Sequence, residues 1–265
     1  MKTTLFYFTG TGNSLFIARE LAKRNGETEI IPIPRMTTKD ELKEGLNMVE
    51  ERIGIVFPTY GGGMPLPVFD WVRQVQLKPG QYFFAVATYG SLPGNVLGQA
   101  GRLLKERKLK LSAGFKIRMP GNLTFISGAL SPEEQRKLFF KAVQKLDRAA
   151  ETIKKNKMFI ERTGILAKLY SRSMKAQKRR PFHENFKTDS RCNGCGTCVK
   201  ICRSYNITMK DGKPVWHDLC GCCFACLQWC PMESIQFGES TIGRKRYHHP
   251  EIVLNDITLS GTEAL

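Results

Sequence analysis

The cysteines constrain this chain more than any other feature, because all nine lie between Cys192 and Cys230. Eight of them form two runs with one spacing, offset by 28 residues: Cys192-x2-Cys195-x2-Cys198-x3-Cys202 and Cys220-x2-Cys223-x2-Cys226-x3-Cys230. A disulfide-stabilised chain would spread its cysteines more widely, and free thiols at this density persist in a reducing compartment. The spacing therefore predicts metal-binding thiolates and a cytoplasmic protein.

The spacing resembles that of bacterial two-cluster ferredoxins, in which three close cysteines and one distant cysteine hold each [4Fe-4S] cluster. The resemblance implies one ligand set of Cys192, Cys195, Cys198 and Cys230, and a second of Cys220, Cys223, Cys226 and Cys202. Tetrahedral zinc is the alternative, since it also accepts paired C-x2-C spacing. Zinc is disfavoured because it has no use for a third evenly spaced cysteine followed by x3-Cys-Pro.

Two residues depart from the ferredoxin pattern. Arg203 follows Cys202 where the pattern has proline, which puts the local backbone and solvent shielding in doubt. Cys222 lies outside the register and is interpreted as a small buried apolar residue. Between the runs, Asn206–Met209 and Lys213–Trp216 flank an Asp-Gly pair and predict a hairpin. The repeat as a whole predicts pseudo-two-fold symmetry.

The first half of the sequence alternates strand and helix signals. Short apolar runs each precede a loop with glycine or proline, and most of these loops lead into helical spacing. The expected strands are Thr4–Phe8, Glu29–Ile33, Ile53–Phe57, Tyr82–Ala87 and Leu111–Met119, the last half-exposed at a sheet edge. The expected helices are Ser14–Lys23, Pro67–Gln74 and a long one from a Ser131 cap to about Lys155. This alternation predicts an α/β fold with a doubly wound parallel sheet.

The loop from Thr9 to Ser14 follows the first strand and precedes the first helix. Its backbone N–H groups and the hydroxyls of Thr9, Thr11 and Ser14 are suited to a phosphate. A dinucleotide fingerprint needs a third glycine where Leu15 stands, and a Walker A loop needs a Gly-Lys-Ser/Thr that is missing. The loop therefore predicts a mononucleotide, with an ordinary tight turn as the alternative.

The segment from Phe6 to Ser14 resembles the FMN phosphate loop of flavodoxins. That resemblance implies strand order 2-1-3-4-5 and two further loops, Pro58–Gly63 and Thr88–Asn95, around the isoalloxazine ring. The implied FMN-binding residues are Thr9, Gly10, Thr11, Gly12, Asn13, Ser14, Pro58, Thr59, Tyr60, Gly61, Gly62, Thr88, Tyr89, Gly90 and Gly94. Met119–Asn122, after the fifth strand, is expected either to border the flavin or a domain interface, or to be a plain turn.

Ten Lys and Arg residues against one acidic residue, Glu161, mark the stretch 154–180. It is interpreted as a solvated linker helix; a docking surface for an acidic electron partner and a nucleic-acid contact are the alternatives. The formal net charge of +17 agrees with an acidic partner. No apolar run is long enough to span a membrane, and no signal peptide is expected at the start.

Taken as a whole, the chain resembles the EFR1-type ferrodoxins, in which a flavodoxin-like domain precedes a small α+β two-cluster ferredoxin-like domain. The expected divisions are 1–156 for FMN, 157–184 for a basic linker helix, 185–240 for the clusters and 241–265 for a tail. The implied function is electron transfer between FMN, two [4Fe-4S] clusters and a redox partner protein. No catalytic residue stands out, and the four histidines fall outside the predicted flavin loops.

Two other functions stay open. A flavoenzyme could reduce a small quinone or nitro-type acceptor at the FMN, with the clusters as its internal electron supply. A redox-sensing nucleic-acid binder would rest on the basic linker alone, so nucleic acid is not the expected partner. The oligomeric state is left open, with a dimer as one possibility.

Overall fold

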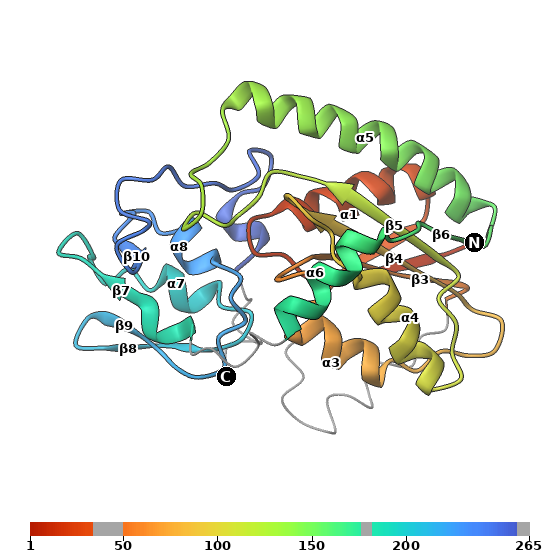
Figure 1. Ribbon diagram of the computed structural model, residues 1–265, viewed down its shortest axis with the longest axis horizontal. Coiled ribbons are helices and arrows are strands. Elements are labelled where there is room, and N and C mark those ends of the chain that lie inside the picture. Colours follow the sequence, from red (N-terminus) through yellow and green to blue (C-terminus); the bar gives the residue numbers. More distant parts are fainter. Residues whose placement is uncertain (34–49, 176–181, 259–265) are drawn as a thin grey trace.

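A six-stranded parallel sheet forms the N-terminal half of the computed structural model, which describes residues 1–33, 50–175 and 182–258. The strand order is β2-β1-β3-β4-β5-β6 (Figure 1). The strands are β1 (Thr3–Tyr7), β2 (Thr28–Pro32), β3 (Arg52–Pro58), β4 (Tyr82–Tyr89), β5 (Ala113–Arg118) and β6 (Phe159–Ile160). The predicted flavodoxin-like order 2-1-3-4-5 is confirmed, with one short strand added after β5.

Helices cover both faces of this sheet (Figure 1). On one face lie α1 (Asn13–Asn25) and α5 (Pro132–Lys154), and on the other lie α3 (Leu66–Gln74) and α4 (Val96–Glu106). Strand β4 shows the consequence, because Phe84 and Val86 join one apolar cluster while Phe83 joins the other. A parallel strand buried on both faces needs a continuous apolar run, as this sequence supplies.

The predicted start of the long helix α5 is confirmed. The Ser131 hydroxyl accepts a hydrogen bond from the Glu134 amide at 3.3 Å, and the Glu134 carboxylate accepts one from the Ser131 amide at 2.9 Å. Pro132 occupies the first turn, where its missing N–H leaves nothing unsatisfied. This reciprocal cap fixes where the chain turns back over the sheet.

Two expectations about the middle of the chain are wrong. Strand β5 is buried at every residue from Ala113 to Ile117, because α5 covers it and β6 pairs with Ala113 and Gly114. The stretch 157–184 also contains more than a solvated linker helix. It holds β6, the helix α6 (Ile165–Lys175) and the start of a 3-10 turn, while residues 176–181 lie outside the described residues.

The C-terminal region, residues 182–258, is called the cysteine-bearing part. It consists of short elements (Figure 1). They are the 3-10 turn η1 (Phe182–Asn185), β7 (Phe186–Thr188), α7 (Thr197–Lys200), β8 (Ile207–Lys210), β9 (Lys213–Trp216), α8 (Ala225–Gln228), β10 (Ile235–Phe237) and η2 (Leu254–Asp256). The predicted hairpin is present, with β8 antiparallel to β9 and both turn residues at positive φ. In the tail, Ile252 and Val253 form no strand, and η2 begins at Leu254.

The backbone of this part repeats as its sequence does. Gly194 and Gly196 have φ of 72° and 71°, and the residues 28 positions later, Cys222 and Phe224, have φ of 52° and 58°. The same offset relates Tyr205 and Glu233, at 47° and 46°. Residues other than glycine rarely adopt this left-handed backbone conformation. Its recurrence at matching positions indicates that the two cysteine runs have similar backbone conformations. None of the helices in the described ranges is both long and apolar enough to cross a bilayer.

Candidate functional site

A pocket lies at the carboxyl ends of the parallel strands, where doubly wound folds bind ligands. It is called the sheet-edge pocket, and it encloses about 340 Å³. Loops after β1, β3, β4 and β5 form its wall. The lining residues are Thr9, Gly10, Thr11, Asn13, Ser14, Pro58, Thr59, Tyr60, Thr88, Tyr89, Gly90, Met119, Pro120, Gly121 and Asn122. The structure thus brings together most of the residues predicted to bind FMN, and Met119–Asn122, one of whose expected roles was to border the flavin, lines the same pocket.

Hydrogen bonds hold the loop between β1 and α1 in place. The Gly12 amide donates to Thr9 Oγ1 at 3.0 Å, and the Ser14 and Thr88 hydroxyls are 2.9 Å apart. Asn13 Nδ2 donates to the carbonyl of Pro120 at 2.9 Å. Thr59 Oγ1 is the exception, because it is buried without a hydrogen-bond partner in the described residues. Such an orphaned hydroxyl in a pocket wall is suited to a polar ligand atom.

Four of the predicted FMN-binding glycines do not line the pocket. Gly61 and Gly62, with φ of 53° and 71°, form the two central residues of a tight turn in which Tyr60 and Gly63 exchange backbone hydrogen bonds. Gly94 has φ of 59°, and a Cβ there would collide with the backbone of Gly62. A Cβ at Gly12 would meet Ile252 at 2.9 Å. These glycines serve turns and close packing.

Two tyrosines face the sheet-edge pocket. Burial raises the pKa of the Tyr60 hydroxyl well above its usual range, and the nearby thiols of Cys223 and Cys222 add to the increase. Burial also raises the pKa of Tyr89; Glu161 adds to this increase, and Arg118 opposes it. Both hydroxyls therefore stay protonated near neutral pH and can donate hydrogen bonds.

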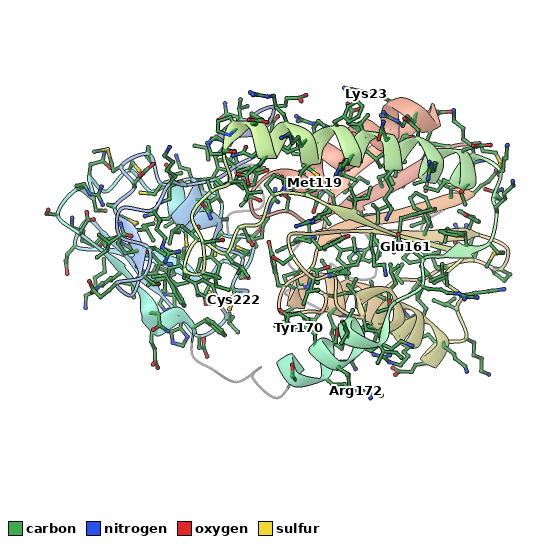
Figure 2. The ribbon with its side chains drawn as sticks, turned by 45° about the horizontal axis from the view of Figure 1, so that its top comes forward. Lys23, Met119, Glu161, Tyr170, Arg172 and Cys222 are labelled. Atoms are coloured by element: carbon green, nitrogen blue, oxygen red, sulfur yellow. The ribbon has the colours of Figure 1, made fainter. Side chains whose placement is uncertain are left out.

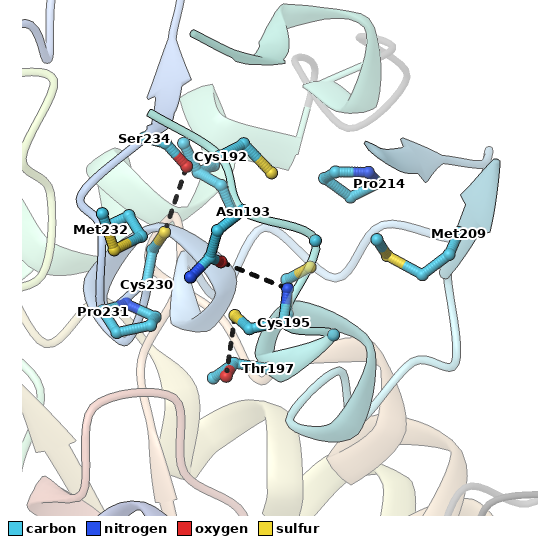
Figure 3. A pocket seen from close by; sticks show the side chains of 14 residues that line it. Cys192, Asn193, Cys195, Thr197, Met209, Pro214, Cys230, Pro231, Met232 and Ser234 are labelled. Carbon is cyan, nitrogen blue, oxygen red and sulfur yellow. Dashed lines mark hydrogen bonds between the residues drawn. The ribbon is translucent and has the colours of Figure 1, made fainter. Parts of the chain in front are cut away.

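Cys192, Cys195, Cys198 and Cys230, called the first thiol set, line a cavity of about 310 Å³ (Figure 3). Cys195 is exposed and Cys198 is buried. Burial raises the pKa of Cys198 to about 11, and the charges of Cys195 and Cys230 act in the same direction. The two cysteine runs therefore cross here as the sequence implies, because Cys230 comes from the second run.

Cys202, Cys220, Cys223 and Cys226, called the second thiol set, are also neighbours. Burial raises the pKa of Cys223 to about 12, and Cys202 and Cys220 lie close enough to raise it further. In the described residues, no three His, Cys, Asp or Glu side chains form a group that could hold a single metal ion. The first set surrounds a cavity instead of converging on a point.

The two departures from the ferredoxin pattern have structural roles. Cys222 is half-buried, and its thiol donates toward the carbonyl of Cys220 at 3.7 Å. The hydrogen bond with Cys220 and burial both raise the pKa of Cys222. Arg203 is buried and donates to the carbonyl of Ile257 at 3.2 Å. The residue that replaces proline therefore holds the C-terminal segment.

The second thiol set lies directly against the sheet-edge pocket. Asn122 Nδ2, in the pocket wall, donates to the Cys223 carbonyl at 3.0 Å. A Cβ on Gly10 would lie 2.8 Å from that same oxygen. The indole N–H of Trp229 donates to the Gly10 carbonyl at 3.0 Å. Pocket and thiols thus share a wall made of Gly10, Asn122 and Cys223.

Little in the sequence indicates that the tail contributes to this region. Tyr247 donates from its hydroxyl to Asn13 Oδ1 at 2.6 Å, and the His249 amide donates to the Thr11 carbonyl at 2.8 Å. The His249 ring is fully buried and stacks on Phe16 with centroids 4.0 Å apart. The cluster of aromatic and histidine residues at 247–249 was the available signal, but it has no periodicity that predicts burial.

No protein-family model matches the sequence, and no curated protein is significantly similar to it. Among solved structures, an FMN-dependent NADH-azoreductase from Bacillus anthracis in complex with FMN is 13% identical, with a TM-score of 0.43, and the match covers 58% of this chain and 100% of that one. A Streptococcus pneumonia flavodoxin is 14% identical, with a TM-score of 0.37 and coverage of 57% and 96%. The Trp repressor binding protein of Bacillus subtilis is 14% identical, with a TM-score of 0.40 and coverage of 56% and 98%.

Structural similarity at this level does not indicate the function of this chain. The fold class rests instead on the chain's own strand order and helix placement, which define a flavodoxin-like α/β fold.

Proposed function

We propose that this chain is an electron-transfer protein of the EFR1-type ferrodoxin kind, holding FMN in the sheet-edge pocket and a [4Fe-4S] cluster at each thiol set. The observation that carries the proposal is the shared wall. Two candidate redox sites with different chemistry meet at Cys223, whose carbonyl accepts a hydrogen bond from Asn122 of the pocket. When bound, the flavin would exchange one or two electrons and each cluster one.

The residues of the pocket fit FMN. The loop from Thr9 to Ser14 offers backbone N–H groups at the start of α1, where the helix dipole favours a phosphate. Thr59 Oγ1 supplies an unused hydroxyl, and Tyr60 and Tyr89 supply aromatic walls with protonated hydroxyls. Asn13 and Asn122 would then fix the loops against the cysteine-bearing part.

The two thiol sets fit clusters by their donors. Sulfur ligands select iron–sulfur clusters, zinc and copper(I), and each set offers four thiols. Crossing the runs would tie both halves of the cysteine-bearing part to both clusters. The cluster at the second set, beside the pocket, would exchange electrons with the flavin. The cluster at the first set would exchange electrons with a partner, because Cys195 is exposed.

We place the redox partner at the first thiol set. Met209 and Met232 line the first cavity and expose 38% and 41% of their surface. Lys213, at the rim, donates to the Cys192 carbonyl at 2.8 Å, and Lys200 and Lys210 are exposed nearby in the chain. Exposed methionines beside these lysines would suit an acidic protein partner.

The test starts from anaerobically purified full-length protein, with iron, sulfide, zinc and released flavin measured on one sample alongside its visible spectrum. About eight irons and one FMN per chain are expected. Cys195→Ser should lower the iron content, whereas Cys222→Ser, which removes the supernumerary thiol, should leave it unchanged. Zinc without iron or flavin would contradict the cofactor assignment.

Anaerobic mixing separates this function from that of a small-molecule reductase. The carrier function predicts rapid reoxidation of the reduced protein by an acidic carrier such as a flavodoxin. Reoxidation by many small quinones or nitro compounds, but by no carrier protein, would favour the enzyme.

A further inference from the structure

A second surface pocket lies on the far side of the Tyr60–Gly63 turn, between α4 and α6. It is called the basic pocket, and it encloses about 740 Å³. The residues that line it are Gly61, Gly62, Gly63, Asn95, Gln99, Arg102, Lys168, Ser171 and Arg172. Three of these side chains are cationic and none is acidic. The pocket is therefore a concentration of positive charge within a defined cavity.

No described residue supplies a counter-ion for the three cations. Arg102, Lys168 and Arg172 are exposed, and none of them forms an ion pair with a residue in the described ranges. Like charges that face one cavity repel each other, and a bound anion converts this repulsion into attraction. Arginine also offers paired N–H donors that match phosphate oxygens. The charge pattern favours a ligand with several negative charges.

The wall also carries a buried amide donor. Gln99 is only 8% exposed, and its Oε1 accepts a hydrogen bond from the Met64 amide at 3.0 Å. Its Nε2 has no hydrogen bond to a described residue and is left as a donor at the pocket wall. Amide and guanidinium groups together make a lining of donors, which suits a ligand rich in acceptor oxygens.

Helix α6 is fixed in place over the turn. Ser171 Oγ donates to the Gly62 carbonyl at 2.6 Å and accepts from the Asn95 amide at 2.6 Å. A Cβ on Gly62 would lie 2.9 Å from the ring of Tyr170 (α6, labelled in Figure 2). One hydroxyl thus links the helix to the loops after β3 and β4. The backbone that carries Lys168 and Arg172 is therefore fixed beside the pocket, which lowers the entropic cost of binding.

We propose that the basic pocket binds a small molecule carrying a diphosphate, of the nucleoside diphosphate or dinucleotide class. The three cations match the charge of such a ligand, and the Gln99 amide offers a further donor to its oxygens. Since Tyr60 lines the sheet-edge pocket and Gly61 lines the basic pocket, the ligand would lie beside the first site. The proposal concerns binding alone and stands independently of the cofactors proposed above.

Titration calorimetry on the full-length protein tests this inference, with inorganic pyrophosphate, ADP and reduced nicotinamide adenine dinucleotide as separate probes. At least one probe is expected to bind, with an affinity that falls as salt is added. Equal affinity for pyrophosphate and ADP would assign recognition to the diphosphate, and tighter binding of a nucleotide would assign part of it to the nucleoside. No binding of any probe up to millimolar concentration overturns the proposal.

Two charge-matched variants decide whether this pocket is the site. Arg102→Gln/Lys168→Gln/Arg172→Gln should weaken binding about a hundredfold. Lys105→Gln/Arg136→Gln/Lys141→Gln removes the same charge from exposed positions elsewhere on α4 and α5 and should change affinity by less than about threefold. Equal losses in both variants would show attraction to overall charge and would overturn the site. If the triple variant misfolds, Arg172→Gln against Lys141→Gln gives the same comparison with a single exposed charge in each.

Discussion

The sheet region and the cysteine-bearing part bury apolar surface on very different scales. The sheet is covered on both faces by helices, and two clusters of buried apolar side chains fill the layers. The cysteine-bearing part has sheets of only two short strands, and its own buried cluster consists of Phe186, Cys198, Ile207, Phe224, Cys226, Leu227 and Ile235. A core this small, with two thiols in it, is typical of domains that need a metal or crosslink.

The smaller part has a second source of stability in the sheet region itself. Ile201, Ala225 and Trp229 belong to the same apolar cluster as α1 and α5, and Ile252 and Ile257 of the tail join them. The sheet region therefore contains a complete core of its own, whereas the cysteine-bearing part buries some of its apolar side chains against the sheet region.

Metal removal should break this comparison most clearly. Amide hydrogen exchange, followed on reduced protein with and without the proposed iron, should show a loss of protection of about a hundredfold in β8 and β9. Strands β1, β3 and β4 should keep their protection because none of the fully buried residues in their two apolar clusters is a proposed ligand. Unchanged protection in the hairpin would show that the cysteine-bearing part is stable without metal.

His249 gives the next largest effect, in a defined pH range. Burial lowers the pKa of this histidine to about 4, and His248 contributes to the decrease. Between that value and the ordinary value of 6.5, the unfolded chain binds a proton that the folded chain does not. The free energy of unfolding should therefore fall as pH decreases through this range, by at most about 3 kcal/mol.

The substitution His249→Phe should flatten that pH dependence. A phenyl ring keeps the stack between Phe16 and Phe139, whose centroids lie 4.0 and 4.6 Å from the imidazole. Urea unfolding at several pH values from 4 to 7 measures the slope. His217→Asn, at an exposed position, is the control and should keep the slope of the original protein. An unchanged slope in His249→Phe would assign the pH dependence to other groups.

The sheet could be predicted because its signals are local and repeated. Apolar runs with loops after them predicted the five strands, the resemblance to flavodoxins implied their order, and Ser131 with Glu134 marked the start of α5. Strand β6 could not be predicted, since Phe159 and Ile160 are two apolar residues in a basic stretch. These two residues form a strand only because the edge of β5 lies beside them in the folded protein, and the local sequence contains no signal for that contact.

The sequence predicted the position of the sheet-edge pocket better than the role of each residue near it. The motif loops met at one sheet edge, as parallel strands require, but Gly12, Gly61, Gly62 and Gly94 serve turns and packing. A glycine in a motif signals that the backbone needs room, without saying whether a ligand or another chain segment fills it. The ligand assignments at the thiols stay a prediction, although the crossing of the two runs brings the predicted partners together.

A salt bridge between the two regions should give the smallest effect. Arg19 of α1 contacts both carboxylate oxygens of Asp256, at 2.6 and 3.3 Å. Asp256→Asn should lower the free energy of unfolding by about 1 kcal/mol, because a paired contact that is partly shielded exceeds an ordinary surface pair. Glu133→Gln is the matched control, because the side chains of Glu133 and of its partner Lys137 are each 67% exposed. This substitution should lower the free energy of unfolding by only a few tenths of a kcal/mol. Equal effects would mean that this pair adds no more than an ordinary surface pair, and that the tail is held by the packing of Ile252 and Ile257 and by the hydrogen bonds of Tyr247 and His249.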